Sequence, residues 1–362
     1  MIGRAIDQIQ QHPAGSSLHE PYVNDATIYV KLAERVSGRI PRPVNPHYIW
    51  GDALEELEAR SPQVRLLNLE TSVTRSTRYW RGKQVHYRMH PANIECLGVL
   101  RPDCCVLANN HMLDWGIEGL RETLSTLRDA GIRSCGAGLD WRSALEPVAL
   151  PLTPGSEDAG RLLIFAFGVG SSGIPSTWAA TEGKPGICYL DAATPQTAYQ
   201  VCDLIEQYKG PLDRVIVSLH WGGNWGYEIS DDHIGFAHSL IDSGAADMLY
   251  GHSSHHPVGI EIYRGKLILY SCGDLINDYE GITARIPYRS DLSLMYWIGL
   301  NTVTGHLMDL RMTPLRIRKF RLERAPEEDT TQLKENLQKA SSVFGSNFEL
   351  DFEPDLTIRL IH

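Results

Sequence analysis

Several features are missing from this sequence, and each absence excludes a class of protein. No stretch of the 362 residues approaches the roughly 18 uninterrupted apolar residues of a membrane-spanning helix, so we expect no membrane span. The first residues, MIGRAIDQIQQHPAG, lack the apolar core of a secretory signal, which predicts a cytoplasmic protein. None of the seven cysteines forms a Cys-x-x-Cys pair, so we expect no disulfide framework.

The sequence also lacks an excess of basic residues. It has 34 Lys and Arg against 44 Asp and Glu, a formal net charge of −10. Nucleic-acid binding without sequence preference depends on Lys and Arg, so we expect no nucleic-acid partner. The basic run at residues 311–324 alternates with apolar residues, which is typical of the solvated face of a strand.

Short apolar runs recur along the chain, and each ends in polar or glycine-rich residues. They cover residues 64–70, 104–111, 161–168, 214–223 and 246–252. Runs of this length between turn residues predict buried strands, and residues 119–132 and 231–245 between them show helical periodicity. This alternation of strands and helices predicts an α/β layered fold.

From about residue 258 the pattern changes to hairpins. Turns are predicted at Arg264-Gly265 and Thr304-Gly305. An amphipathic helix at 327–344 and a short strand, LTIRLI, follow. We therefore expect a mixed sheet or a two-sheet sandwich flanked by helices.

Polar side chains follow four of the five predicted strands at the point where each strand ends. They are Glu70, the Asn110-His111 pair, His220 and His252. Sites in α/β sheets form at the carboxyl ends of strands, and a carboxylate there is costly unless it is paired or coordinating. Carboxylate, amide and imidazole donors without a thiolate suit Mn, Fe or Zn, so the four segments together predict a divalent-metal site.

Each segment alone also fits a structural role. Glu70 could cap a loop, the asparagines could form a turn, and His220 could be a satisfied core residue. Trp221 and Trp225 fit core anchors as well as a pocket wall. In GHSSHH, His252 and His255 could converge on one ion, with His256 pointing away.

The order of the motifs points to a family. NLE, ANNH with D-x-G, HWG, GH-x-x-H, IE-x-Y-x-G and Y-S-x-G together resemble the CapA family of poly-γ-glutamate capsule synthesis. The likeness runs from GRAID to about residue 310, and HYRMHPANI resembles the actinobacterial branch. The resemblance implies a calcineurin-like metallophosphoesterase fold, a layered β-sandwich flanked by helices, over residues 1–310. Residues 311–362 would be a strand–helix–strand extension packed on it.

The resemblance also implies roles for particular residues. The implied metal ligands, for one or two ions of Mn, Fe or Zn, are Glu70, Asn110, His220, His252 and His255. His111 would be the general acid, with Asp114 orienting its second nitrogen. We assign substrate contacts to Arg4, suited to a carboxylate or phosphate, and to Asn68, Trp221 and Asn224.

The sequence departs from the family pattern in three places. Members usually carry Gly-Asp, whose Asp is a metal ligand, just before the Gly-Arg that stands here at residues 3–4. We therefore expect either a longer natural chain or a protein without this ligand. Ser253-Ser254 replaces the common His-Pro, and Asp274 replaces the common Asn.

Three functions are compatible with these features. The first is a metal-dependent hydrolase or transferase acting on a γ-glutamyl amide or a phosphoryl group. The second is a metallophosphoesterase of nucleotides or phosphorylated metabolites. The third is a non-catalytic accessory protein that binds a polymer or a synthase or ligase subunit.

Overall fold

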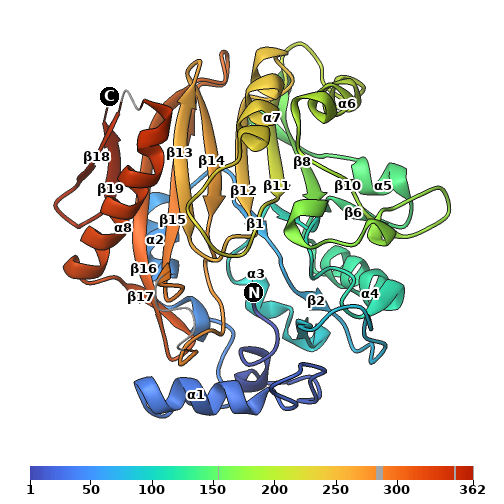
Figure 1. Cartoon of the computed structure of the whole chain (residues 1–362), viewed down its shortest axis with the longest axis vertical. Helices are drawn as coiled ribbons and strands as arrows, with labels where there is room; N and C mark the ends of the chain where they lie inside the picture. Colours follow the sequence, from blue (N-terminus) through green and yellow to red (C-terminus); the bar gives the residue numbers. More distant parts are fainter. Residues whose placement is uncertain (154, 283–287, 346–347, 362) are drawn as a thin grey trace.

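A seven-stranded sheet runs through the middle of the molecule (Figure 1). The computed structural model describes residues 1–153, 155–282, 288–345 and 348–361. The strand order is β10-β8-β11-β12-β14-β13, with β7 paired to β8. The bounds are β7 (Val148–Thr153), β8 (Ser156–Val169), β10 (Tyr189–Leu190), β11 (Arg214–His220), β12 (Met248–His252), β13 (Pro257–Tyr263) and β14 (Lys266–Cys272).

The centre of this sheet is parallel. Strand β11 pairs in parallel with β8 on one side and β12 on the other, and β12 pairs in parallel with β14. Six of the seven residues of β11 are buried, which explains why RVIVSLH reads as a continuous apolar run. Because these strands are parallel, their carboxyl ends lie at the same edge of the sheet.

Two smaller sheets pack against the large one. The three-stranded parallel sheet holds β1 (Leu66–Asn68), β4 (Cys104–Val106) and β5 (Ser134–Cys135). The five-stranded antiparallel sheet holds β15 (Leu292–Leu300), β16 (Leu307–Arg318), β17 (Arg321–Arg324), β18 (Glu349–Phe352) and β19 (Ile358–Ile361). Buried residues of all three sheets, such as Val106, Ile164 and Met312, share one apolar cluster, so the sheets pack face to face.

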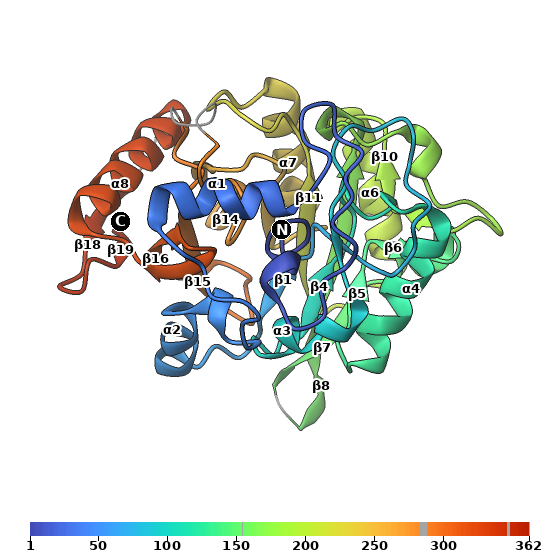
Figure 2. The ribbon, with the colours of Figure 1, turned by 90° about the horizontal axis from the view of Figure 1, so that it is seen from below.

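Helices cover the outer faces of these sheets. Their bounds are α1 (Thr27–Ser37), α2 (Ala53–Arg60), α3 (Glu95–Gly98), α4 (Gly116–Asp129), α5 (Trp141–Leu145), α6 (Pro195–Glu206), α7 (Asp231–Asp242) and α8 (Glu327–Ser341). Val201 of α6 and Phe236 of α7 pack on Phe165 and Val217 of the large sheet. Helix α8 lies beside β13, and α1 lies on the underside of the molecule (Figure 2).

Most of the predicted elements are present, with shifted bounds. The helix predicted at 119–132 is α4, which ends before Gly131, where the backbone turns into the left-handed region at φ 73°. The predicted turn at Arg264-Gly265 joins β13 to β14, with φ 50° and 76°. Two short pairs, β2 (Ser72–Val73) with β3 (Arg88–Met89) and β6 (Ala137–Gly138) with β9 (Gly186–Ile187), complete the set.

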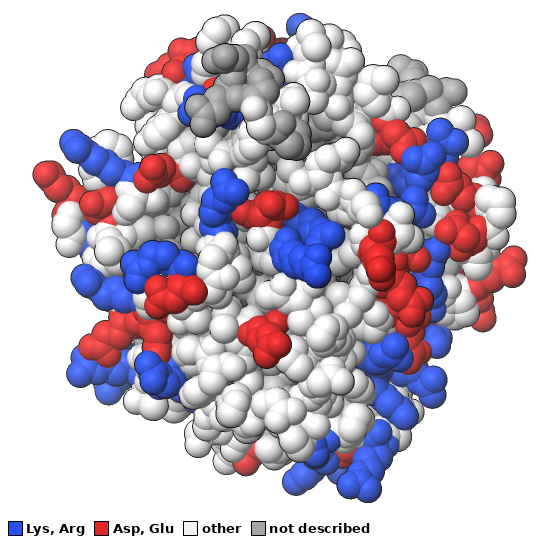
Figure 3. Space-filling view, turned by 180° about the vertical axis from the view of Figure 1, so that it is seen from behind, with Lys and Arg blue, Asp and Glu red and all other residues white. Residues whose placement is uncertain are grey.

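The mixed α/β class is therefore confirmed. The proposed boundary between residues 310 and 311 falls inside β16, so the five-stranded sheet takes residues from both sides of it. The division into two units stays a prediction. Within the described ranges, no helix combines the length and the apolarity needed to cross a bilayer. On the face shown in Figure 3, basic and acidic side chains lie interspersed.

Candidate functional site

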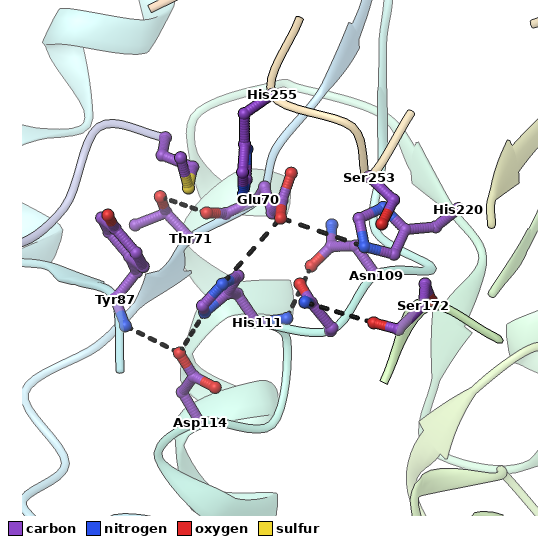
Figure 4. Close-up of polar contacts among 12 residues, drawn as sticks. Glu70, Thr71, Tyr87, Asn109, His111, Asp114, Ser172, His220, Ser253 and His255 are labelled. Atoms are coloured by element: carbon purple, nitrogen blue, oxygen red, sulfur yellow. Dashed lines mark hydrogen bonds and ion pairs between the residues drawn. The ribbon is translucent and has the colours of Figure 1, made fainter. Parts of the chain in front are cut away.

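The ends of four strands meet at one place. Strands β11 and β12 align His220 with His252, and β1 and β4 align Asn68 with Val106, so the segments after these strands leave the sheets side by side. Glu70 Oε1 lies 3.9 Å from His220 Nε2 and 3.9 Å from His111 Nε2 (Figure 4). The structure therefore brings together polar residues from separate segments, as the strand-end pattern predicted.

Three buried polar atoms of this site have no hydrogen-bond partner among the described residues. They are Glu70 Oε1, Asn110 Oδ1 and His220 Nε2. The Asn110 amide is oriented by its Nδ2, which donates to the Ser172 carbonyl at 3.5 Å and leaves Oδ1 free. Buried polar atoms are normally paired, so three unpaired ones in a single site need an explanation.

The donor chemistry of these atoms fits a divalent cation. A carboxylate oxygen, an amide oxygen and an imidazole nitrogen suit Mn, Fe or Zn. In the part of the chain that the structure describes, no three His, Cys, Asp or Glu side chains are already arranged around a point where an ion would sit. Asn110 is none of these residue types, so the three unpaired atoms combine an amide oxygen with a carboxylate oxygen and an imidazole nitrogen.

Burial controls the charge of Glu70. The side chain is 4% exposed, and burial raises the pKa of its carboxyl to about 7. The charged neighbour His255 acts in the opposite direction, favouring the ionised form. Asn68 Nδ2 donates to Glu70 Oε2 at 3.2 Å, and Oε1 has no hydrogen-bond partner among the described residues.

His252 lies behind His220. The two Nδ1 atoms are 2.6 Å apart, and His252 Nε2 contacts Ser218 Oγ at 2.8 Å. Burial lowers the pKa of His252 to about 3 and that of His220 well below its usual value, so both rings are neutral at neutral pH. Neutral imidazole is the form that binds a metal.

The His111 ring is held by two opposite charges. Its Nδ1 lies 2.6 Å from Asp114 Oδ2 and 2.9 Å from Lys83 Nζ, and Lys83 also donates to Asp114 Oδ1 at 2.6 Å. Burial lowers the pKa of His111 to about 4. Burial opposes the charge of Asp114, but His111 and Lys83 outweigh it and hold the pKa of Asp114 below its usual value.

Lys83 is the residue that the sequence analysis missed. It stands in the connection between β2 and β3, in a stretch with neither strand nor helix periodicity. Its ammonium also donates to the Asn110 carbonyl, which ties this connection to the segment after β4. A family alignment would be needed to mark it, because no local pattern does.

His255 is engaged on both ring nitrogens. Nδ1 lies 3.2 Å from the Asp274 carboxylate, and Nε2 lies 3.2 Å from the Tyr279 hydroxyl. Burial alone would lower the pKa of His255, but the Asp274 charge raises it. His256, the expected bystander, accepts a hydrogen bond from Gly226 N. A metal role for His255 would require it to exchange one of these partners.

Two of the predicted substrate contacts lie in buried, satisfied positions. Arg4 donates from Nε and Nη2 to Asp278 and from Nη1 to Glu20. Trp221 is 4% exposed and donates from Nε1 to the Tyr270 carbonyl at 2.9 Å, which favours its alternative role as a core anchor. A substrate role for either residue stays a prediction.

The other two predicted contacts lie differently. Asn68 is half-buried at the end of β1, beside Glu70. Asn224 has an exposed side chain, and its backbone oxygen accepts a hydrogen bond from His255 N. The neighbouring Trp225 ring contacts the His255 ring, with centroids 5.2 Å apart and planes tilted by 53°, so this glycine-rich loop lies against His255.

Comparisons with known proteins agree with the motif order. Residues 1–279 match the family described as bacterial capsule synthesis protein PGA_cap. A probable polyglutamine synthesis accessory protein of Mycobacterium tuberculosis is 46% identical over 95% of this chain and 90% of its own length. The PGA biosynthesis protein CapA of Bacillus subtilis is 27% identical over 58% of this chain and 52% of its own length.

A further relative and one solved structure are more distant. The capsule biosynthesis protein CapA of Bacillus anthracis is 27% identical over 48% of this chain and 39% of its own length. The solved structure covers 51% of this chain and 62% of its own at 10% identity, with a TM-score of 0.31, too low to assign a fold. The family match spans most of the sequence, and the chain belongs to the bacterial capsule synthesis protein family PGA_cap.

Proposed function

We propose that this protein is a metal-dependent hydrolase or transferase of poly-γ-glutamate or polyglutamine-type polymer synthesis, with a metallophosphoesterase-like fold. Its substrate would carry a γ-glutamyl amide or a phosphoryl group. The observation that carries the proposal is the set of unpaired buried atoms, Glu70 Oε1, Asn110 Oδ1 and His220 Nε2. A structural cluster of this kind would be expected to pair them internally.

Glu70, Asn110 and His220 would hold the ion, with His252 and His255 as further candidates. Mn, Fe or Zn suits these donors, and the family resemblance allows one or two ions. Such an ion would lower the pKa of a water molecule and polarise the group that is cleaved. The ionised form of Glu70, which burial disfavours by raising its pKa to about 7, would be stabilised by that charge.

His111 would give a proton to the leaving group from Nε2, the atom that faces Glu70. Nδ1 lies 2.6 Å from Asp114 Oδ2, and a carboxylate whose pKa is held below its usual value only accepts, so Nδ1 donates to Asp114. Nε2 therefore carries a transferable proton only in the doubly protonated ring, which burial and Lys83 oppose and which the Asp114 charge favours. Lys83 donates to Asp114 Oδ1 and to the Asn110 carbonyl, and so holds the carboxylate beside the ring.

The test compares three variants in protein prepared with Mn, Fe or Zn. His220→Ala should lose the bound metal, whereas His111→Ala should keep it and lose turnover of γ-glutamyl peptides by about 10²- to 10⁴-fold. His238→Ala is the matched control, because His238 also pairs with a buried carboxylate, Glu261, outside the site. Metal content and turnover that do not depend on His220 would refute the proposal.

The substrate panel distinguishes the two enzymatic possibilities. Turnover of an aryl phosphate or a nucleotide, without turnover of γ-glutamyl peptides, would assign the site to phosphoester hydrolysis. Turnover of γ-glutamyl peptides alone would assign it to amide chemistry. The negative net charge of −10 makes a small phosphorylated metabolite a better phosphoester candidate than a nucleic acid.

A non-catalytic role is the second candidate function. It is supported by the Mycobacterium tuberculosis relative, which is named an accessory protein and aligns over 90% of its length. The partner would be a synthase or ligase subunit. A purified ligase subunit that binds both the wild type and His111→Ala equally, in a preparation without turnover, would favour this role over catalysis.

A further inference from the structure

Asn109 stands directly before the Asn110-His111 pair, and its side chain is completely buried. Its Oδ1 accepts a hydrogen bond from His111 N at 3.1 Å. Its Nδ2 donates to the Leu69 carbonyl and to Asn68 Oδ1, each at 3.0 Å. Because a backbone N–H only donates and a carbonyl only accepts, these partners fix which end of the amide is which.

The fixed amide of Asn109 determines how Asn68 is turned. Asn68 Oδ1 accepts from Asn109, so its Nδ2 must point the other way, towards Glu70. Nδ2 then donates to Glu70 Oε2 at 3.2 Å, which holds that oxygen. The second oxygen, Oε1, is left without a partner among the described residues and 3.9 Å from His220 Nε2.

We propose that Asn109 is a positioning residue that aims Glu70 Oε1 at the metal position, acting through Asn68. This inference rests on the proposed function, because it assumes that Oε1 is a ligand atom. Asn109 follows β4 and Asn68 ends β1, so the chain of hydrogen bonds connects the two strand ends that carry Glu70 and Asn110. Asn68 thereby gains a role that differs from the predicted substrate contact.

The experiment is a double-mutant cycle read as Mn²⁺ affinity by titration calorimetry. Asn68→Ala and Asn109→Ala should each weaken Mn²⁺ binding about 10- to 100-fold, the usual effect of removing a partner behind a ligand. Because both residues act through one chain, the double variant should bind within about twofold of the weaker single variant. If the fold-losses of Mn²⁺ affinity in the two single variants multiply in the double variant, the proposal is overturned.

A matched control separates positioning from general stability. Asn93 is another buried asparagine, whose Nδ2 donates to Asp7 Oδ1 and to the His12 carbonyl, away from the site. Asn93→Ala should lower the melting temperature and leave Mn²⁺ affinity within about twofold of wild type. If Asn109→Ala does not fold, the half-buried Asn68→Ala variant carries the test alone.

A metal-free crystal structure of Asn68→Ala distinguishes the two ways of failing. We expect the Glu70 carboxylate to turn, so that the distance from Oε1 to His220 Nε2 departs from 3.9 Å. A carboxylate that keeps its place would overturn the positioning role even if the wild type binds Mn²⁺. A wild type that binds no Mn²⁺, with a turned carboxylate in the variant, would overturn the proposed function and not the positioning.

Discussion

Two buried clusters of polar and charged residues lie close to each other and are built in opposite ways. In the first, each of three Arg4 nitrogens donates to a carboxylate, and Asp278 also accepts from the Tyr87 hydroxyl and from Ala5 N. In the second, Glu70, Asn110 and His220 each leave one buried atom unpaired. A cluster that satisfies its own charges stabilises the fold, whereas one that does not is available to a ligand.

The largest expected effect comes from breaking the satisfied cluster. Asp278→Asn removes the charge that two Arg4 nitrogens share and leaves a buried guanidinium without its main counterion. Breaking a buried ion pair in this way costs about 3–5 kcal/mol of unfolding free energy. Urea denaturation measures it. A loss below about 1 kcal/mol would show that Glu20 alone can hold Arg4.

Removing a charge from the unsatisfied cluster should instead stabilise the metal-free protein. Burial raises the pKa of Glu70 to about 7 from 4.5, so the folded state binds this proton more tightly than the unfolded chain. Without metal, ionisation of Glu70 therefore takes nothing from the unfolding free energy below about pH 4.5, and the unfolding free energy falls as the pH rises to about 7. Glu70→Gln removes this loss and should stabilise the metal-free protein by about 2–3 kcal/mol at pH 8.

The measurement for Glu70→Gln is urea denaturation at several pH values. The advantage of the variant over wild type should shrink towards pH 5, and saturating Mn²⁺ should reverse it, because only the wild type gains stability from the ion. Parallel pH profiles of the two proteins would contradict the burial of an uncompensated carboxylate at this position.

Lys83 tests whether an ion pair behind the site contributes to turnover as well as to stability. Lys83→Met keeps the length of the side chain but removes the donor that holds Asp114 beside His111, so turnover should fall about 10- to 100-fold with metal content unchanged. Lys266→Met is the matched control, since Lys266 pairs with the buried Asp247 at 2.5 Å outside the site. Equal turnover losses in the two variants would mean that only stability is affected.

The smallest effect is expected at an exposed ion pair. Arg78 and Glu118 lie 3.1 Å apart, with side chains 80% and 59% exposed. Glu118→Gln should change the unfolding free energy by less than about 0.5 kcal/mol, because solvent screens both charges. Chemical denaturation checks this value, and a change above about 1 kcal/mol would weaken the contrast drawn between buried and exposed pairs.

The members of the unsatisfied cluster could be predicted because each follows a strand that is recognisable in the sequence. Glu70, Asn110 and His220 come directly after apolar runs, and the ends of parallel strands share one edge. The satisfied cluster has no such signal in the sequence. Arg4 and Asp278 are 274 positions apart, and neither their spacing nor their local pattern indicates that they pair.

Some hydrogen-bond partners of the predicted residues could not be predicted either, because they also lie far away in the sequence. The pairing of His255 with Asp274 and Tyr279 depends on how the segment after β14 folds back, which periodicity does not encode. Helix α6 was also absent from the sequence predictions, although Thr194 and Pro195 at its start are a readable capping signal. The local sequence pattern determines where a strand ends, whereas contacts between loops depend on segments that only the complete fold brings together.

The alignment of His220 with His252 has a consequence for the order of folding. Strands β11 and β12 are parallel neighbours joined through α7, so their pairing closes a long loop and belongs to the slower, non-local steps. The contact between the two Nδ1 atoms exists only after that step. Any ligand that needs both rings therefore binds only chains in which β11 and β12 have paired, and its uptake during refolding reports when that pairing forms.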